Sequence, residues 1–476
     1  MRAITLSLSM VLAAFPGTGG CGRDCDPAQT CKSVLIDNIP HVRQKPDFCG
    51  EACAEMYLRK LGSDIDQDYV FHVSGTDPTL GRGCNTAELA RALKRIGFNV
   101  GNVWQKVAAD KAGQQMQQQF AALHADLLSS VPSIVCMRYD AGSNAAEHFR
   151  LVVGYDRKTD QVVYHDPAEP DGAYRRMKRG KFLKLWPLKY EKKWWTVIRL
   201  RLEPTAIEKR LPVEGFTNAD YAQHMMVLRR KIPDPNFSVI LQKPFFVIGN
   251  QPPAMVRRWA RGTVKWAVDL LKKEYFEKDP DEIIDIWLFA DDTSYRKYAR
   301  LIFADNPSTP FGYYSDRHNA LVMNVATGGG TLVHEIVHPF IRANFPQCPA
   351  WFNEGLASLY EQSTQRNGRI WGLTNWRLAN LQEKIRKKQL PSFARLIKSG
   401  DDWFYGAGSG DNYAQARYLC YYLQEKNLLR KFYHEFAANC RSDPTGYQTL
   451  KKVLGENDMD AFQKRWEQFV LKLHFP

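Results

Sequence analysis

The segment TLVHEIVHPF, residues 331–340, places two histidines four residues apart, and this spacing strongly constrains the local fold. On an α-helix, positions i and i+4 lie one above the other, so His334 and His338 can bind one metal ion if the segment is helical. Glu335 would then lie beside the open coordination position, where it can accept a proton from an attacking water. The pattern alone is also compatible with a solvent-exposed helix face.

A third ligand is available at a suitable distance in the chain. The segment PAWFNEGLASLYE predicts a second helix that starts near Trp351, from which Glu354 would face the first helix. Two histidines and one glutamate, with water as the fourth ligand, are typical of catalytic zinc, so we predict that the chain binds Zn2+. Thr331 is the expected N-cap of the first helix. Pro339 removes one backbone hydrogen bond, so a kink is expected there.

A second group of reactive residues lies in the segment QKPDFCGEACAEM. Its turn-forming start places Cys49 at the beginning of a predicted helix with Asp47 as cap, and a helix N-terminus stabilises a thiolate. Gln44 can donate its side-chain amide to an oxyanion. Cys53, one turn further on, is expected to be buried or to form a disulfide with a distant cysteine such as Cys84. We therefore predict Cys49 as a nucleophile.

A thiol nucleophile needs a base and a group that orients the base. His148 opens the predicted strand HFRLVVGYD, and Asp166 closes the next predicted strand, QVVYHD. If the two strands are antiparallel neighbours, the start of one lies beside the end of the other, and the two side chains can touch. His41 and His165 are alternative bases, and a purely structural role for a histidine at a strand start stays open.

Composition indicates a globular protein with more than one domain. The chain has 476 residues, 44% hydrophobic and 24% charged, with a net charge of +14. Its lysines and arginines are scattered, which favours general solubility and weak attraction to acidic surfaces over nucleic-acid binding. The organisation that we predict is a signal peptide at 1–20, a Cys/Gly-rich lead-in at 21–32, a mixed domain at 33–202, a linker with a connecting helix at 203–233, and a mostly helical domain at 234–476.

The N-terminus predicts export. Met1-Arg2 is followed by an apolar run and then by small residues, which is typical of a secretory signal and too short to span a bilayer. Cys21 follows the small residues and is a candidate site for a lipid anchor. An extracytoplasmic protein, periplasmic or secreted, can form disulfides. The chain has ten cysteines, and setting aside Cys21 and Cys49 leaves an even number.

The second half resembles the gluzincin metallopeptidases, specifically the peptidase-MA-like family of exported bacterial proteins. The resemblance covers roughly 236–476 and includes FADNPSTPFGYY, TGGGTLVHEIVHPF, PAWFNEGLASLYE and YAQARYLCYYLQE. It implies the same three zinc ligands and the same general base. It also implies that the predicted edge strand ALVMN lines the substrate cleft and pairs with an extended peptide. Tyr413 is the candidate for assisting the oxyanion, with packing in the core as the alternative.

The first half resembles the C39-like papain-fold cysteine peptidases. The segments HVRQKPDFCGEACAEMYLRKLG, HFRLVVGYD and VVYHDPA carry the resemblance, which covers about 33–200. It implies Gln44 as oxyanion donor, Cys49 as nucleophile, His148 as base and Asp166 as the residue that orients it. The expected fold class is therefore α+β, a papain-like domain followed by a zincin-like, mostly helical domain.

Together these features predict an exported peptidase that acts on peptide or protein substrates, with a zinc site and a thiol site on one chain. A different class of function also fits the sequence, a scaffold in which the N-terminal domain recognises peptides without cutting them. An amidase or acyl transferase on the papain fold is a third interpretation.

Overall fold

The computed structural model describes residues 31–142 and 146–475. The predicted signal peptide at 1–20 and the candidate lipid-anchor residue Cys21 lie outside the described residues. Within the ranges that are described, no helix combines the length and the apolar character needed to cross a membrane.

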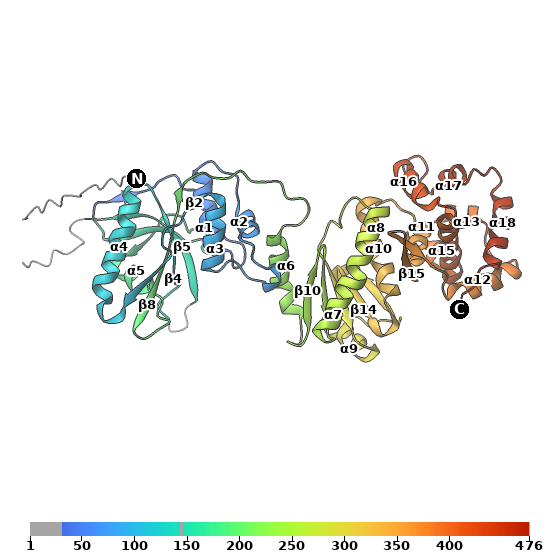
Figure 1. Ribbon diagram of the computed structural model, residues 1–476, viewed down its shortest axis with the longest axis horizontal. Coiled ribbons are helices and arrows are strands. Elements are labelled where there is room, and N and C mark those ends of the chain that lie inside the picture. Colours follow the sequence, from blue (N-terminus) through green and yellow to red (C-terminus); the bar gives the residue numbers. More distant parts are fainter. Residues whose placement is uncertain (1–30, 143–145, 476) are drawn as a thin grey trace, which may run out of the picture. The chain divides into compact units, whose positions relative to one another are not determined.

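The chain forms two units, whose helices and strands are labelled in Figure 1. Each unit has its own sheet. The first unit consists of Met1–Ser74 and Cys84–Lys209, and the second consists of Gly75–Gly83 and Arg210–Pro476.

A seven-stranded sheet forms the centre of the first unit, with strand order β3-β8-β4-β5-β6-β7 and β1 paired to β5. All of its neighbouring strands are antiparallel. Alternating side chains of β4, β5 and β6 are buried on both faces because helices cover the sheet. The strands are β1 (Val34–Leu35), β3 (Trp104–Ala108), β4 (Ser133–Arg138), β5 (Glu147–Asp156), β6 (Gln161–His165), β7 (Arg175–Lys178) and β8 (Trp194–Arg201).

Helix α1 packs against β4 and β5 and carries the candidate nucleophile at its first residue. Its N-cap is Phe48, and Asp47 precedes the cap with a left-handed backbone, φ 63°, so the expectation that Asp47 caps the helix is wrong. The turn, not a side-chain cap, sets the helix start. The helices are α1 (Cys49–Lys60), α2 (Gln67–Ser74), α3 (Thr86–Ile96), α4 (Ala112–Leu128) and α5 (Arg179–Leu185), and a separate short pair joins β2 (Phe98–Asn99) to β9 (Glu203–Pro204).

The second unit contains a five-stranded sheet of order β10-β11-β12-β14-β13. Strands β11, β12 and β14 are parallel, whereas β10 and β13 are antiparallel edge strands. The prediction that ALVMN is an edge strand is wrong, because β14 pairs with β12 on one side and β13 on the other. Its backbone therefore has no free edge for a substrate. The strands are β10 (Ser238–Gln242), β11 (Phe245–Gly249), β12 (Ile284–Phe289), β13 (Gly312–Ser315) and β14 (Ala320–Asn324).

Helix α6 (Asn218–Lys231) lies inside the segment that the sequence predicts as a linker with a connecting helix. Thr217 and Asp220 form a capping box at its start. The buried residues Tyr221 and Met225 pack in an apolar cluster on the sheet of the second unit. The helix is thus part of that unit's core and not a free connector.

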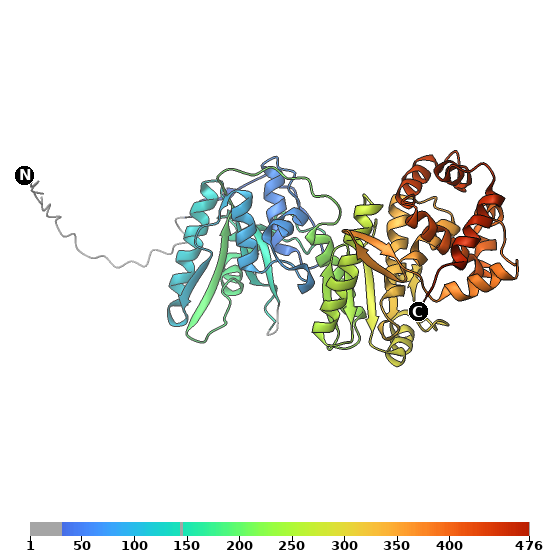
Figure 2. The same ribbon diagram turned by 45° about the vertical axis from the view of Figure 1, so that its right-hand side comes forward.

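The remainder of the second unit is helical apart from a hairpin, and Figure 2 shows its last helices, in orange and red, gathered at the C-terminal end of the chain. The hairpin joins β15 (Ser363–Arg366) to β16 (Arg369–Gly372). The helices are α7 (Pro253–Trp259), α8 (Trp266–Glu274), α9 (Asp292–Phe303), α10 (Gly330–Asn344), α11 (Ala350–Leu359), α12 (Arg377–Arg386), α13 (Phe393–Lys398), α14 (Asp401–Tyr405), α15 (Ser409–Glu425), α16 (Leu429–Asn439), α17 (Tyr447–Leu454) and α18 (Met459–Leu471), with a π-helical segment at 260–265.

Helix α10 carries both histidines of the predicted metal site. Its N-cap is Gly329, so Thr331 lies within the first turn and does not cap the helix as expected. The helix continues through Pro339 to Asn344. At its start, a Cβ added to Gly330 would lie 2.1 Å from the backbone oxygen of Glu361, so this end of the helix touches the chain that follows α11.

We expect Gly330→Ala to lower the free energy of unfolding by about 1–3 kcal/mol, because backbone atoms must move to admit the methyl group. The matched control is Gly410→Ala in α15, where an added Cβ meets nothing within 4 Å. That change should leave stability unaltered or raise it slightly. Urea unfolding of both variants beside the wild type tests this, and equal effects of the two substitutions would contradict the close approach.

Candidate functional site

Cys49 is the partly exposed cysteine of the first unit, whereas the other cysteines described there are buried. Every described cysteine is a free thiol, so the alternative of a Cys53–Cys84 disulfide is not realised. Cys53 is 0% exposed, and its Sγ lies 3.7 Å from the backbone oxygen of Phe149. The prediction that Cys53 is a core residue is confirmed. The two cysteines of α1 therefore have different surroundings.

His148 and Asp166 meet as the sequence predicts. Strands β5 and β6 are antiparallel, and His148 Nε2 lies 2.8 Å from Asp166 Oδ1. Both side chains are buried. Since Nε2 is bound to the carboxylate, Nδ1 is the ring atom left to act on the thiol. The backbone of Phe149, the next residue after His148, hydrogen-bonds the Cys49 thiol, which brings the nucleophile beside this pair.

Arg150 is a part of this site that sequence reasoning missed. It lies two residues after His148, hence on the same face of β5, and its Nε donates to Asp166 Oδ2 at 2.7 Å. Burial would raise the pKa of Asp166, but the hydrogen bonds and charges of His148 and Arg150 lower it to about 2. Asp166 is therefore ionised at neutral pH. The i+2 spacing from His148 is the signal that could have identified Arg150.

Burial raises the pKa of the Cys49 thiol to about 12, and the hydrogen bond from the Phe149 backbone opposes this only in part. The charges of Glu51 and Asp47 raise the pKa further. A helix N-terminus favours a thiolate, but desolvation acts in the opposite direction and is the largest contribution, so the pKa of the thiol is raised and not lowered as expected.

Gln44 lies five residues before Cys49, just ahead of the turn that leads into α1. Its backbone N–H donates to the Pro167 oxygen at 2.9 Å, which ties the turn before α1 to the residue after Asp166. Within the described part of the chain, the side-chain Oε1 of Gln44 is buried without a hydrogen-bond partner. A buried amide with an unused polar atom suits contact with a ligand.

The two alternative histidines have structural surroundings. His41 Nε2 donates to the backbone oxygen of Asp166 at 2.9 Å, so it braces the loop and not the thiol. His165 is 0% exposed, and burial followed by the charge of His41 lowers its pKa to about 4. Neither side chain is held by the Asp166 carboxylate, whereas His148 is, so His148 remains the candidate base.

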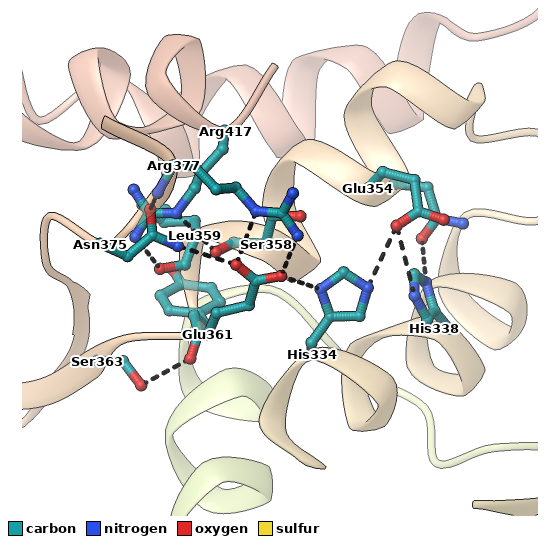
Figure 3. Close-up of polar contacts among 12 residues, drawn as sticks. His334, His338, Glu354, Ser358, Leu359, Glu361, Ser363, Asn375, Arg377 and Arg417 are labelled. Carbon is teal, nitrogen blue, oxygen red and sulfur yellow. Dashed lines mark hydrogen bonds and ion pairs between the residues drawn. The ribbon is translucent and has the colours of Figure 1, made fainter. Parts of the chain in front are cut away.

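In the second unit, His334 and His338 on α10 converge with Glu354 on α11, as Figure 3 shows. One ligand atom from each lies within 4.8 Å of the others. Glu354 Oε2 lies 3.2 Å from His334 Nε2 and 3.8 Å from His338 Nε2. This oxygen is buried and has no hydrogen-bond partner among the described residues. Converging, unsatisfied donor atoms of this kind fit a divalent cation such as Zn2+.

Outer contacts direct both imidazoles toward Glu354. His334 Nδ1 lies 3.4 Å from Glu361 Oε1, and His338 Nδ1 lies 3.0 Å from Asn353 Oδ1. Such partners fix the ring orientation of metal-binding histidines and increase their basicity. Sequence reasoning missed both. Asn353 adjoins a predicted ligand, but Glu361 lies two turns beyond it, where no short motif identifies it.

Glu361 is itself held by cationic and amide groups. Arg377 donates to both of its oxygens, at 2.8 and 3.0 Å, and Asn375 donates to Oε2 at 2.9 Å. Burial would raise the pKa values of Glu354 and Glu361, but His334 and the other hydrogen-bond partners lower each to about 2. Both carboxylates are therefore anionic, and the site carries the charge that a cation requires.

Tyr413 is packed partly into the core, with its ring beside Phe404 and the Arg377 guanidinium 5.3 Å from its centroid. Burial, followed by the charge of Glu354, raises the pKa of Tyr413. Tyr405, which sequence reasoning missed, donates its hydroxyl to Glu354 Oε1 at 2.9 Å. Two tyrosines therefore border the same glutamate, and Tyr413 is partly buried beside the predicted metal ligand.

Two family models match parts of the chain. Residues 36–192 match the Peptidase_C39 like family, so the N-terminal part carries a C39-like cysteine peptidase domain. Residues 329–445 match a family described as protein of unknown function, DUF1570, which covers the predicted zinc residues but names no activity. The comparison with curated proteins gave no match.

Two solved structures are similar to this chain. The peptidase domain of Streptococcus ComA, described as a bi-functional ABC transporter involved in a quorum sensing pathway, is 18% identical. It covers 34% of this chain and 96% of its own, with a TM-score of 0.22. Xylellain, a cysteine protease from Xylella fastidiosa, is 8% identical and covers 40% of this chain and 95% of its own, with a TM-score of 0.26.

We expect alkylation of Cys49 by iodoacetamide to be slow at neutral pH and to accelerate about tenfold per pH unit up to at least about pH 9, because only the thiolate reacts. The raised pKa of Cys49 is the cause. Peptide mapping by mass spectrometry would follow the rate, with Cys49→Ser to identify the modified peptide and the partly exposed Cys440 as an internal reference. A rate that is already constant near pH 7 would show a preformed thiolate.

Proposed function

We propose that the chain is a peptidase with two active sites of different chemistry, a thiol site in the first unit and a zinc site in the second. The observation that best supports it is the 2.8 Å contact of His148 with Asp166, inside the segment that matches the C39-like family. The substrate that both chemistries require is a peptide or protein. An extracytoplasmic location, with an optional lipid anchor at Cys21, belongs to the same proposal.

In the thiol site, each residue has a separate role in acyl transfer. Asp166 holds the Nε2–H of His148, so Nδ1 accepts the Cys49 proton while the sulfur attacks the carbonyl carbon. The Gln44 amide and the Cys49 backbone N–H stabilise the oxyanion. His148 then gives the proton to the leaving amine, and a water activated by the same imidazole hydrolyses the thioester. The neutral resting thiol makes this transfer part of the chemical step.

In the second unit, His334, His338 and Glu354 would hold Zn2+, which supplies Lewis acidity at the open coordination position. Glu335 follows His334 directly on α10 and is half-buried. It would accept the proton of the attacking water and pass it to the leaving amine. Glu361 and Asn353 keep the imidazole rings in place during this exchange, and Tyr405 keeps the Glu354 carboxylate oriented.

A second candidate function rests on the protonated state of the thiol. Burial raises the pKa of Cys49 to about 12, and a neutral thiol suits a domain that recognises peptides without cutting them. In that case the zinc site alone would hydrolyse peptides. The amidase or acyl-transferase interpretation uses the same thioester but transfers the acyl group to an added amine.

Turnover of a peptide library by single-site variants distinguishes these functions. We expect Cys49→Ala and Glu335→Ala each to abolish a different subset of cleavages, because each removes one nucleophile or base and leaves the other site intact. Mass spectrometry of the digests provides the measurement, and the double variant is the control for background cleavage.

If Cys49→Ala changes peptide affinity but no cleavage, the thiol domain is a recognition module. Products linked to added hydroxylamine in a Cys49-dependent manner would instead identify an acyl transferase. Cleavage that survives in the double variant would contradict both sites.

Glu361→Gln should weaken zinc binding about 10- to 100-fold, because the neutral amide no longer orients His334 or increases its basicity. Competition with a chromogenic chelator measures this affinity. Glu383→Gln is the matched control, since Glu383 is an exposed glutamate paired only with Lys387 on the same unit. Equal zinc affinity of both variants would show that Glu361 does not support the metal site, and no zinc binding by the folded wild type would contradict the site itself.

A further inference from the structure

Exposed aromatic side chains gather at one edge of the sheet in the first unit. β3 is the edge strand, and it pairs only with β8 in that sheet. Trp104 on β3 is 47% exposed, Trp194 on β8 is 45% exposed, and Tyr190 in the preceding loop is 60% exposed. Exposure of about half of a large aromatic ring to water is unfavourable, so burial of these rings against a partner would stabilise a complex at this edge.

The register of β3 and β8 puts these groups on one face. Trp104 pairs with Ile198, Lys106 with Thr196, and Ala108 with Trp194. Residues opposite one another in an antiparallel pair point to the same side, and so do residues two apart on a strand. Trp104, Lys106 and Trp194 therefore share a face. We call Trp104, Lys106 and the segment 189–195 the aromatic–lysine strip.

Positive charge surrounds the rings. Segment 189–195 reads KYEKKWW, and with Lys106 the strip has four lysines and one acidic residue, Glu191. Lys106 lies 3.7 Å from Glu191, but both side chains are well exposed, so this pair neutralises little. Trp195 pairs with Val107 and so lies on the opposite face from Trp104 and Trp194, where Lys189 Nζ is 4.1 Å from the centroid of its ring.

We propose that the aromatic–lysine strip binds an anionic lipid surface. Tryptophan and tyrosine rings, apolar in the body and polar at one edge, settle at the level of the lipid headgroups, and each nearby lysine adds attraction to anionic lipid. A polyanion without aromatic groups of its own would need the lysines but not a row of half-exposed rings. The proposal stands whether or not either active site cleaves peptides.

The strip lies close to the thiol site. Trp104 pairs with Ile198 on β8, Ile198 pairs with Cys136 on β4, and Cys136 pairs with Phe149, the residue that follows His148. A membrane bound at the strip would therefore present Cys49 and His148 near the lipid surface. Segments of substrate that emerge at that surface would be the ones within reach.

Quenching by brominated lipid tests the proposal on the full chain. The probe is vesicles of phosphatidylglycerol and phosphatidylcholine with brominated acyl chains, which quench tryptophans that enter the bilayer. Residues 1–30 contain no tryptophan, so binding through the predicted signal segment gives no signal of its own. We expect quenching of the wild type with anionic vesicles and at least tenfold more lipid to be needed with phosphatidylcholine alone.

Trp104→Thr/Trp194→Thr should remove this quenching, while Trp376→Thr should retain it, because Trp376 is equally exposed, at 52%, in the other unit. Lys192→Glu/Lys193→Glu should raise the lipid concentration for half-maximal quenching at least tenfold. Circular dichroism would confirm that each variant is folded.

Equal quenching of the Trp104/Trp194 variant and the wild type, or no quenching of the wild type, would overturn the proposal. Vesicle binding that the lysine changes abolish and the Trp104→Thr/Trp194→Thr changes leave intact would identify a polyanion site instead.

Discussion

The ionised Asp166 carboxylate is the interaction on which the thiol site depends. It is 2% exposed, and a buried carboxylate is stable as an anion only when donors compensate for the lost water. His148 contacts one carboxylate oxygen and Arg150 donates to the other, so both oxygens have partners within the protein. The same contacts fix the imidazole and anchor the loop after β6. Because Arg150 also donates to the backbone oxygen of Tyr139, strands β4, β5 and β6 meet at this carboxylate.

In the second unit, hydrogen-bond donors likewise compensate the buried carboxylate of Glu361, and Figure 3 shows the residues involved. Arg377 and Asn375 compensate the Glu361 charge, and Glu361 orients His334. Arg417, fully buried, donates to the backbone oxygens of Ser358 and Leu359 and so satisfies the C-terminal carbonyls of α11. The helix that carries Glu354 is thereby fixed at its end. The predicted metal ligands on the two helices keep their spacing because this polar network joins the helices.

The sequence identified residues whose partners lie at short, regular spacings. His334 and His338 are one helical turn apart, and His148 and Asp166 are brought together by adjacent antiparallel strands, so local periodicity was enough. It missed Arg150 and Glu361 because their roles depend on tertiary contacts. Likewise FGYYS has no clear alternation, so the sequence does not predict β13, and without β13 the strand ALVMN is expected at the edge of the sheet. The sequence also does not predict the raised pKa of the Cys49 thiol, because its cause is burial and a short motif does not show burial.

A neutral Cys49 is compatible with the predicted oxidising location. Thiolates, not thiols, attack disulfides and react with oxidants, and burial raises the pKa of the Cys49 thiol. Burial thus protects the nucleophile from forming mixed disulfides, at the cost of a proton transfer in every turnover. In the proposed mechanism, His148 takes the proton, and the Phe149 backbone and the helix N-terminus then stabilise the thiolate. The ionised Asp166, held by Arg150, stabilises the imidazolium that results. The buried pair of Asp166 and Arg150 therefore makes a protected thiol and an active one compatible in the same site.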